Sequence, residues 1–264
     1  TWVPIMRGCR RLVLVGDHKQ LPPTVISRRA EDDGLRRSLF ERLIDVGITP
    51  TMLKTQYRMH PVIAEYSSAR YYDNQLENGV TANERPAPAG FLWPDWEAPV
   101  AFIPVDGVEE LAVDGKSRLN RDEAGWVVKI VEQLLQPGDL QPSDIGVVSP
   151  YNGQVQLLTD LFDGRGILAG EGDDEAEGLE IRSIDGYQGR EKEVIVLSTV
   201  RANDKGEVGF LSDHRRLNVA LTRPRRGLIV VGDSDTLRHD CDWEGWLDWA
   251  RERKLEAWHV LQSF

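Results

Sequence analysis

Short hydrophobic runs alternate with longer amphipathic stretches along this chain. The runs are nearly continuous and rich in branched residues, which is typical of strands buried on both faces of a parallel sheet. We therefore predict five strands, at residues 12–15, 100–105, 145–148, 193–200 and 228–231.

The amphipathic stretches predict helices over residues 38–46, 60–72, 122–135, 153–162, 215–221 and 244–254. Asn120 followed by Glu123 has the spacing of a capping box at the start of the third of these helices. The alternation of strands and helices predicts an α/β fold with a doubly wound, mostly parallel sheet and helices on both faces.

Three segments are predicted to be loops, at residues 83–99, 137–143 and 164–178. The last is strongly acidic and is better explained as a solvated insertion than as a functional arm. Trp243, Trp246 and Trp249 follow one another at a spacing of three near the end of the chain. We expect them to pack against the sheet rather than to dock a partner.

Composition narrows the class of protein. The chain has 264 residues, of which 41% are hydrophobic, and a net charge of −11, so a disordered chain is excluded. No apolar run approaches the ~20 residues of a membrane-spanning helix, and the first residues lack the pattern of a signal peptide. Two distant cysteines and five scattered histidines predict neither a disulfide framework nor a metal site.

The distribution of charge is uneven. The acidic net charge disfavours nucleic acid as a ligand, because phosphate binding needs lysine and arginine. Residues 182–226 differ, since ten basic and six acidic side chains give them a local balance of +4. This segment is therefore the part of the chain best suited to phosphates.

Four motifs carry candidate chemistry: GDHKQLPP at 16–23, QYRMHP at 56–61, SIDGYQGRE at 183–191 and LNVALTRPRRG at 217–227. The first follows a predicted strand and places a carboxylate and an amide where parallel sheets bind ligands, although a capped turn explains it equally well. In the second, Arg58 could fork onto a phosphate and Tyr57 offers a flat face to a base. The glycines of the third permit close backbone approach to a ligand.

The chain lacks a phosphate-binding P-loop, which requires G-x-x-x-x-G-K-[ST]. Residues 115–117 read GKS, but Glu110 stands where the first glycine should be. Residues 122–125 imitate a magnesium-binding DEAx box, but they follow GKSRLNR rather than an apolar strand, so we interpret them as the start of a helix.

Together and in this order, the motifs resemble those of superfamily 1 helicases of the B subgroup, most closely the up-frameshift helicases of nonsense-mediated mRNA decay. The likeness extends through LENGVTANER, SRLNRDEA, SPYNGQ, DGYQGREKEVIVLSTVRAN and LIVVGD. It implies two RecA-like domains of the P-loop NTPase type. Residues 1–55 would be the end of the first domain and contain its GDxxQ motif, and residues 56–264 would be the second domain. It also implies an ATP-dependent helicase that moves 5′ to 3′ on a single strand.

The resemblance implies three catalytic residues. Gln20 would sense the γ-phosphate of ATP, and Arg58 and Arg223 would be arginine fingers that neutralise the transferring phosphoryl group. Pro224 stands where the family usually has alanine, and proline fixes the backbone beside Arg223.

The resemblance also assigns binding residues for ATP and for the nucleic acid. Tyr57 would pack on the adenine, Glu191 would accept hydrogen bonds from the ribose hydroxyls, and Gly189 would allow close approach; the magnesium ligands are expected upstream. Tyr151, among the strand contacts, could equally be a core aromatic at the end of a strand. The contacts to the single strand would fall on Ser149, Pro150, Tyr151, Gln154, Ser183 and Arg201.

Two rival functions stay open at this point. One is a DNA helicase with the same motor, because the motor holds phosphates and stacked bases rather than a sugar. The other is a scaffold that binds nucleic acid without hydrolysing ATP. The expected partners are single-stranded RNA or DNA, ATP and regulatory proteins, with no membrane; the expected location is the cytoplasm, with the nucleus as the alternative.

Overall fold

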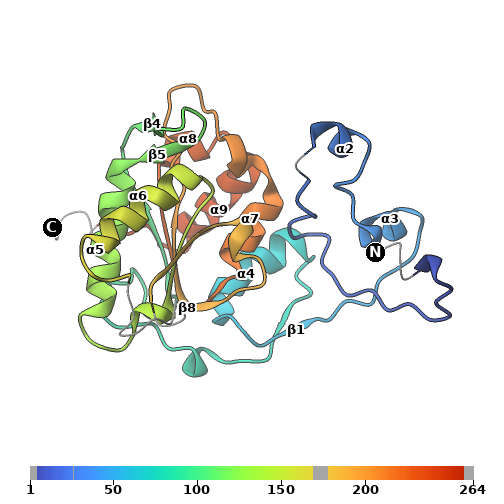
Figure 1. Cartoon of the computed structure of the whole chain (residues 1–264). Coiled ribbons are helices and arrows are strands. Elements are labelled where there is room, and N and C mark those ends of the chain that lie inside the picture. The colour runs from blue at the N-terminus through green and yellow to red at the C-terminus, as the bar shows by residue number, and fades with distance from the viewer. Residues whose placement is uncertain (1–4, 26, 169–177, 259–264) are drawn as a thin grey trace. The chain divides into compact units, whose positions relative to one another are not determined.

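The computed structural model describes residues 5–25, 27–168 and 178–258. Most of the predicted acidic loop therefore lies outside the described residues. The chain forms two compact units, residues 1–53 and 54–264, and each is described by itself (Figure 1). In the described part of the chain, no helix is both long and apolar enough to cross a membrane.

Among the described residues of unit 1 are the short helices α2 at Arg28–Asp32 and α3 at Leu39–Asp45. The second confirms the prediction for residues 38–46, and the side chain of Ser38 caps it by accepting the N–H of Glu41 at 3.0 Å. The predicted strand at residues 12–15 is wrong, because this segment pairs with no other strand, and Val13 and Val15 are 85% and 90% exposed. A strand is stable only beside a hydrogen-bonded neighbour, and the described residues of unit 1 include no strand.

Unit 2 is built on a parallel sheet of five strands in the order β3-β9-β8-β6-β7. The four other predicted strands are all present, and Val196 of the central strand lies between Val147 and Ile229 in register. The fifth strand, β7, is short and polar, so it carries no hydrophobic signal. The strands are β3 at Val100–Pro104, β6 at Ile145–Ser149, β7 at Glu180–Ser183, β8 at Lys192–Ser198 and β9 at Pro224–Gly232.

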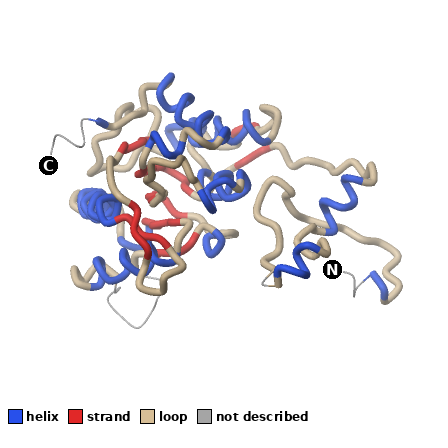
Figure 2. The backbone as a smooth tube through the Cα atoms, turned by 90° about the horizontal axis from the view of Figure 1, so that it is seen from above, coloured by secondary structure: helices blue, strands red, loops and turns tan. Residues whose placement is uncertain are grey.

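Helices cover both faces of this sheet, as predicted for a doubly wound RecA-like fold. Helices α5 and α6 lie on one face and α4, α7 and α9 on the other (Figure 1), and the view from above shows the strands between these two layers (Figure 2). The predicted helices are α4 at Pro61–Tyr71, α5 at Arg121–Leu135, α6 at Asn152–Asp163, α7 at His214–Leu221 and α9 at Cys241–Glu252; a short helix, α8, is at Ser234–Leu237.

Apolar side chains from both layers pack onto the sheet. On one face, Val127 and Ile130 of α5 join the strand residues in a single buried cluster, to which the loop over residues 83–99 adds Phe91. On the other face, Trp243 and Trp246 are buried and Trp249 is partly buried, which confirms that the tryptophan spacing marks a core face. Burial of large aromatic groups contributes much of the apolar stabilisation of such a core.

Small elements flank the sheet. Parallel β1 at Thr55–Gln56 and β2 at Glu77–Asn78 pair with each other, and β4 at Glu109–Leu111 pairs with antiparallel β5 at Arg118–Asn120. The GKS sequence lies in the turn of that hairpin, where the Asp114 carboxylate accepts the N–H groups of Lys116 and Ser117, both at 2.9 Å. The GKS residues therefore belong to a hairpin turn rather than to a P-loop. Short 3₁₀ helices are η1 at Ala82–Glu84, η2 at Pro142–Asp144, η3 at Asp185–Tyr187 and η4 at Gly209–Ser212.

The start of α5 corrects one prediction. The Asn120 side chain caps the helix by accepting the N–H of Glu123 at 3.1 Å, as expected. The Glu123 carboxylate does not complete the capping box, because the Asn120 N–H donates to Gln154 instead. The carboxylate bonds to the end of β8, so a tertiary contact replaces the local one.

Candidate nucleotide and nucleic-acid sites

The parallel sheet separates the predicted site residues of unit 2 into two groups. Glu191 directly precedes β8 and Arg223 directly precedes β9, so both lie at the edge where the strands begin, the amino edge. Ser149 and Ser183 end β6 and β7, and Arg201 follows β8, so these lie at the opposite, carboxyl edge. The residues predicted to bind nucleotide and those predicted to bind nucleic acid thus occupy different edges.

Two polar side chains hold the QYRMHP loop at the amino edge. The Gln56 amide accepts the N–H groups of Arg58 and Met59 at 3.0 and 2.8 Å, and it donates to the Met59 carbonyl at 2.9 Å. The Arg85 guanidinium donates to the carbonyls of Arg58 and Tyr57 at 2.9 and 3.1 Å. Both roles were missed by the sequence reasoning, although both residues belong to motifs that it singled out.

Tyr57 presents an aromatic ring on this loop, and 66% of the residue is exposed. The ring rests on the backbone of Gly79, where an added Cβ would lie only 2.3 Å from Tyr57 Cε1. Glycine at 79 therefore provides the space for the ring. The result is an exposed aromatic residue supported from below, as expected of a group that packs on a base.

Arg58 crosses from the loop to the segments that precede β8 and β9. Its Nε donates to the Glu191 carboxylate, and its Nη1 donates to the carbonyl of Thr222 at 2.9 Å. The Arg58 side chain is 31% exposed, and that of Glu191 is 45% exposed. Gly189, two residues before Glu191, has a φ of 83° and open space around it. The structure thus brings together residues that are far apart in sequence.

Arg223 lies beside Arg58 but is buried, with 3% exposure. Its Nε donates to the carbonyl of Val219 at 2.9 Å, at the end of α7, and its Nη2 donates to Thr222 Oγ1, also at 2.9 Å. A cation in this place stabilises the negative end of a helix dipole. Pro224 begins β9, a position at which a missing N–H is tolerated.

Gln20 lies in unit 1, in a turn after the segment predicted to be a strand. Its N–H donates to the Asp17 carbonyl at 3.3 Å, and the Asp17 carboxylate accepts the N–H of Lys19 at 2.9 Å. This is the capped turn that the sequence allowed as an alternative. The structure describes the turn within unit 1 alone, so the role of Gln20 stays a prediction.

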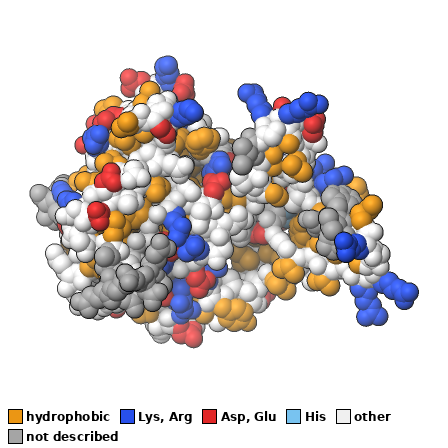
Figure 3. All heavy atoms as spheres, in the orientation of Figure 1, with side chains coloured by type: hydrophobic (Ala, Val, Ile, Leu, Met, Phe, Trp, Pro, Cys, Tyr) orange, Lys and Arg blue, Asp and Glu red, His pale blue; other side chains and the backbone are white. Residues whose placement is uncertain are grey.

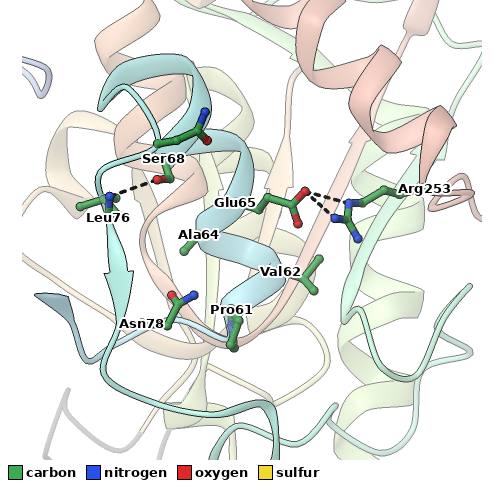
Figure 4. Close-up of a pocket in the computed structure, with 9 residues that line it drawn as sticks. Pro61, Val62, Ala64, Glu65, Ser68, Leu76, Asn78 and Arg253 are labelled. Carbon is green, nitrogen blue, oxygen red and sulfur yellow. Dashed lines mark hydrogen bonds and ion pairs between the residues drawn. The ribbon is translucent and has the colours of Figure 1, made fainter. Parts of the chain in front are cut away.

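A hollow of about 330 Å³ lies beside the first turns of α4 (Figure 4). Pro61 and Val62 line one side, and Asn78 of β2 lines another. The carboxylate of Glu65 at its rim accepts hydrogen bonds from Arg253, one of them at 3.1 Å. Because this pair is already formed, the hollow offers a charged ligand little, and we assign it no role.

At the carboxyl edge, most of the predicted strand contacts are buried. Ser149 and Gln154 have no exposed surface, and Tyr151 and Arg201 are 5% and 4% exposed. The Gln154 amide is engaged on both sides, because it accepts the Asn120 N–H at 2.8 Å and donates to the Asn120 carbonyl at 3.0 Å. Of the predicted set, Pro150 and Ser183 are partly exposed.

Arg201 is the centre of a buried polar network. Its Nε donates to the Glu109 carboxylate at 2.7 Å, and its Nη1 donates to the Tyr151 hydroxyl at 3.3 Å. Burial opposes ionisation of Glu109, but its hydrogen bonds from Arg201 and from the Ala202 N–H outweigh this effect and hold its pKa below the usual range. This geometry supports a structural role for Arg201 in place of a direct phosphate contact.

The basic excess of residues 182–226 is compensated in the folded protein. Seven of its arginines form ion pairs, several with carboxylates outside the segment, and Figure 3 shows acidic and basic side chains intermixed on one face. The local balance of +4 therefore does not translate into a basic surface. The pairs are Arg182 and Arg190 with Glu180, Arg201 with Glu109, Arg215 with Asp213, Arg216 with Asp185, Arg225 with Glu193, and Arg226 with Asp139.

Replacing Arg201 by alanine should lower the free energy of unfolding by about 3–5 kcal/mol, because it leaves the Glu109 carboxylate buried without its cation. Arg182→Ala is the matched control, since this arginine is 44% exposed and its ion pair should contribute less than about 1 kcal/mol. Chemical denaturation measures both values. Equal midpoints for Arg201→Ala and the wild type would refute the structural role.

Glu123 is a further residue whose importance the sequence reasoning missed. It is fully buried at the start of α5, and its carboxylate accepts from Ser198 Oγ at 2.6 Å and from the Val200 N–H at 2.9 Å. Val200 has a φ of 73°, a left-handed conformation that costs a β-branched residue about 1–3 kcal/mol. Burial raises the pKa of Glu123 to about 8, against the opposing effect of these hydrogen bonds. The carboxyl group thus fastens α5 to a strained turn after β8.

Comparison with known proteins gives the family of the chain. The sequence pattern of an AAA domain family matches residues 35–235, and that of a second AAA domain family matches residues 1–28. The chain therefore belongs to the AAA domain family. A solved structure of the C-terminal domain of a possible DNA helicase from a Lactobacillus aligns with 67% of this chain and 88% of that chain, with a TM-score of 0.40 and 13% sequence identity.

Relatives named as regulators of nonsense transcripts are much more similar. A regulator of nonsense transcripts 1 homolog from Neurospora crassa is 46% identical over 92% of this chain. The ATP-dependent helicase NAM7 from Saccharomyces cerevisiae is 42% identical over 95% of this chain. These likenesses confirm the resemblance to superfamily 1 helicases of the up-frameshift type. The chain spans only 22% and 26% of the length of these two relatives.

Proposed function

We propose that this chain is the C-terminal motor half of an ATP-dependent RNA helicase that moves 5′ to 3′ and acts in nonsense-mediated mRNA decay. Relatives named ATP-dependent helicases and regulators of nonsense transcripts support the proposal. The observation that carries it is the cluster at the amino edge, where Tyr57, Arg58, Glu191 and Arg223 come together from three motifs.

The cluster suits a nucleotide chemically. The exposed ring of Tyr57 offers a face to adenine, and the open backbone at Gly189 lets a ribose approach. We propose that Arg58 exchanges Glu191 for the γ-phosphate when ATP binds, which leaves the Glu191 carboxylate to accept hydrogen bonds from the ribose. Arg223 and Gln20 would complete the contacts to the γ-phosphate, and residues outside this chain would hold the magnesium ion.

The single strand is proposed to follow the carboxyl edge of the sheet. Pro150 and Ser183 are exposed enough to touch it, and the buried residues Ser149, Tyr151, Gln154 and Arg201 would shape this edge from beneath. We propose single-stranded RNA as the substrate and regulatory proteins as further partners. The cytoplasm is the proposed location, with the nucleus as the alternative.

ATP turnover by the whole protein that contains this chain tests the proposal. Single-stranded RNA should stimulate turnover strongly, and DNA of identical sequence should stimulate it less. Equal stimulation by DNA would favour a DNA helicase of the same superfamily. Binding of either strand without stimulated turnover would favour a scaffold that does not hydrolyse ATP.

A further inference from the structure

Phe210 is a large apolar side chain that the fold leaves in solvent. It lies in η4, between the end of β8 and the start of α7, and it is 57% exposed. Its ring centroid is 5.4 Å from that of Tyr151, which follows β6. Phe210 therefore lies at the carboxyl edge, beside the residues proposed to shape the path of the strand.

The backbone holds Phe210 firmly in this exposed position. Its N–H donates to the Tyr151 hydroxyl at 3.3 Å, and the same hydroxyl accepts from buried Arg201. The preceding residue, Gly209, has a φ of 57°, and an added Cβ there would lie 2.0 Å from Arg201 Nη1. The buried network thus fixes the backbone that carries an exposed aromatic ring. A ring positioned in advance loses little conformational entropy when a ligand covers it.

A guanidinium group accompanies the ring. The Arg216 guanidinium carbon is 5.4 Å from the centroid of the Phe210 ring. Two hydrogen bonds to the Asp185 carboxylate, at 2.9 and 3.2 Å, hold it there. Aromatic rings and arginine planes are the two kinds of group on which unpaired bases stack.

We propose that Phe210 and Arg216 form a stacking site for one unpaired base of a single-stranded nucleic acid. The proposal rests on the proposed function, because it assigns a contact to the strand at the carboxyl edge. Phosphates alone would not select this site, since the Arg216 charge is already paired with Asp185. The contact is therefore to the face of the base, and it tolerates any sequence.

Fluorescence anisotropy with a short labelled oligouridylate tests the stacking site in this chain. Phe210→Ala should weaken binding about 5- to 150-fold, the loss expected for one stacked base. Phe210→Trp should retain binding. An oligomer of the same length that lacks bases should bind the wild type and Phe210→Ala equally, because it offers phosphates without a face to stack.

Trp96→Ala is the matched control. Trp96 is 55% exposed, almost as much as Phe210, but it precedes β3 and so lies toward the amino edge. This variant should bind the oligouridylate as the wild type does. Thermal melting should give the same Tm for Phe210→Ala and the wild type; a lowered Tm with unchanged binding would mean that Phe210 packs against protein and would overturn the proposal.

The outcomes also separate this proposal from the proposed function. If the wild type binds the oligouridylate and Phe210→Ala binds it equally well, the stacking site is refuted while a strand at the carboxyl edge is not. If the wild type binds neither oligomer, the proposed nucleic-acid face fails, and the stacking site fails with it.

Discussion

Alanine in place of Arg58 should lower the kcat of the whole motor by about 10³-fold or more, while the free energy of unfolding stays within about 1 kcal/mol of the wild type. The Arg58 side chain is partly exposed and pairs with an exposed carboxylate, so the fold does not depend on it. An interaction made chiefly in the transition state lowers kcat, whereas a ground-state contact would raise KM. RNA affinity without nucleotide should be unchanged.

Arg223→Ala should show two effects where Arg58→Ala shows one. The same loss of kcat is expected, but Arg223 is also buried, with 3% exposure, and it donates to the Val219 carbonyl and to Thr222 Oγ1. A hydrogen bond from a charged group contributes about 1.5–3 kcal/mol, and the packing of the buried side chain is lost with it, so the Tm should fall as well. Turnover is therefore compared well below the Tm of the variant.

The two variants are compared by their RNA-stimulated ATPase rates and by thermal melting. Arg190→Ala is the control, because this arginine is a near neighbour whose side chain is 48% exposed and points to Glu180. It should leave kcat close to that of the wild type. A near-normal kcat in both Arg58→Ala and Arg223→Ala would overturn the assignment of the amino edge as the nucleotide site. A lowered Tm with a normal kcat in Arg223→Ala would mean that Arg223 serves only as a helix cap.

Glu123→Gln should change how stability depends on pH. Burial raises the pKa of Glu123 from 4.5 to about 8, so the folded protein holds this proton more tightly than the unfolded chain. The resulting stabilisation is present in full below pH 4.5 and is lost as the pH rises to about 8. Glutamine does not titrate. As the pH rises between these values, the free energy of unfolding of Glu123→Gln should therefore increase relative to that of the wild type, by up to about 5 kcal/mol.

Denaturant unfolding of the wild type and the variant across this pH range gives the difference directly. Glu132→Gln removes an exposed carboxylate from the same helix, and it serves as the control for the change in net charge. A difference between Glu123→Gln and the wild type that is constant with pH would contradict the raised pKa. Glu123→Ala should be destabilising at every pH, because it leaves the Val200 N–H without its acceptor.

Local patterns determined much of the fold. Branched runs such as 194–197 and 228–231 became central strands, because such side chains fill both faces of a covered sheet. Ser38 and Asn120 marked the starts of helices, because a cap depends on residues only a few positions apart. The order of the motifs along the chain also indicated the family, because each motif is a contiguous stretch of residues.

The tertiary structure decided what those local patterns leave open. Residues 12–15 have the composition of a strand, but in the described part of unit 1 no neighbour pairs with them. Arg201 is basic and follows a strand, yet in the folded protein it is buried and its charge is paired with that of Glu109, which is distant in sequence. Phe210 and Leu211 are adjacent apolar residues of η4, yet only the folded structure shows that Phe210 is 57% exposed and Leu211 is 1% exposed.

The sequence by itself determined which chemical groups the protein carries and in what order its motifs follow one another. These groups include the arginines of the motifs and the aromatic residue Tyr57 beside Arg58. Only the tertiary structure decided which of these groups face solvent, which are paired and which share an edge of the sheet. The physical reason is the distance along the chain over which each kind of interaction acts. Helix caps and hydrophobic periodicity act over a few residues, whereas the ion pair between Arg58 and Glu191 joins residues 133 positions apart and exists only after the chain has folded.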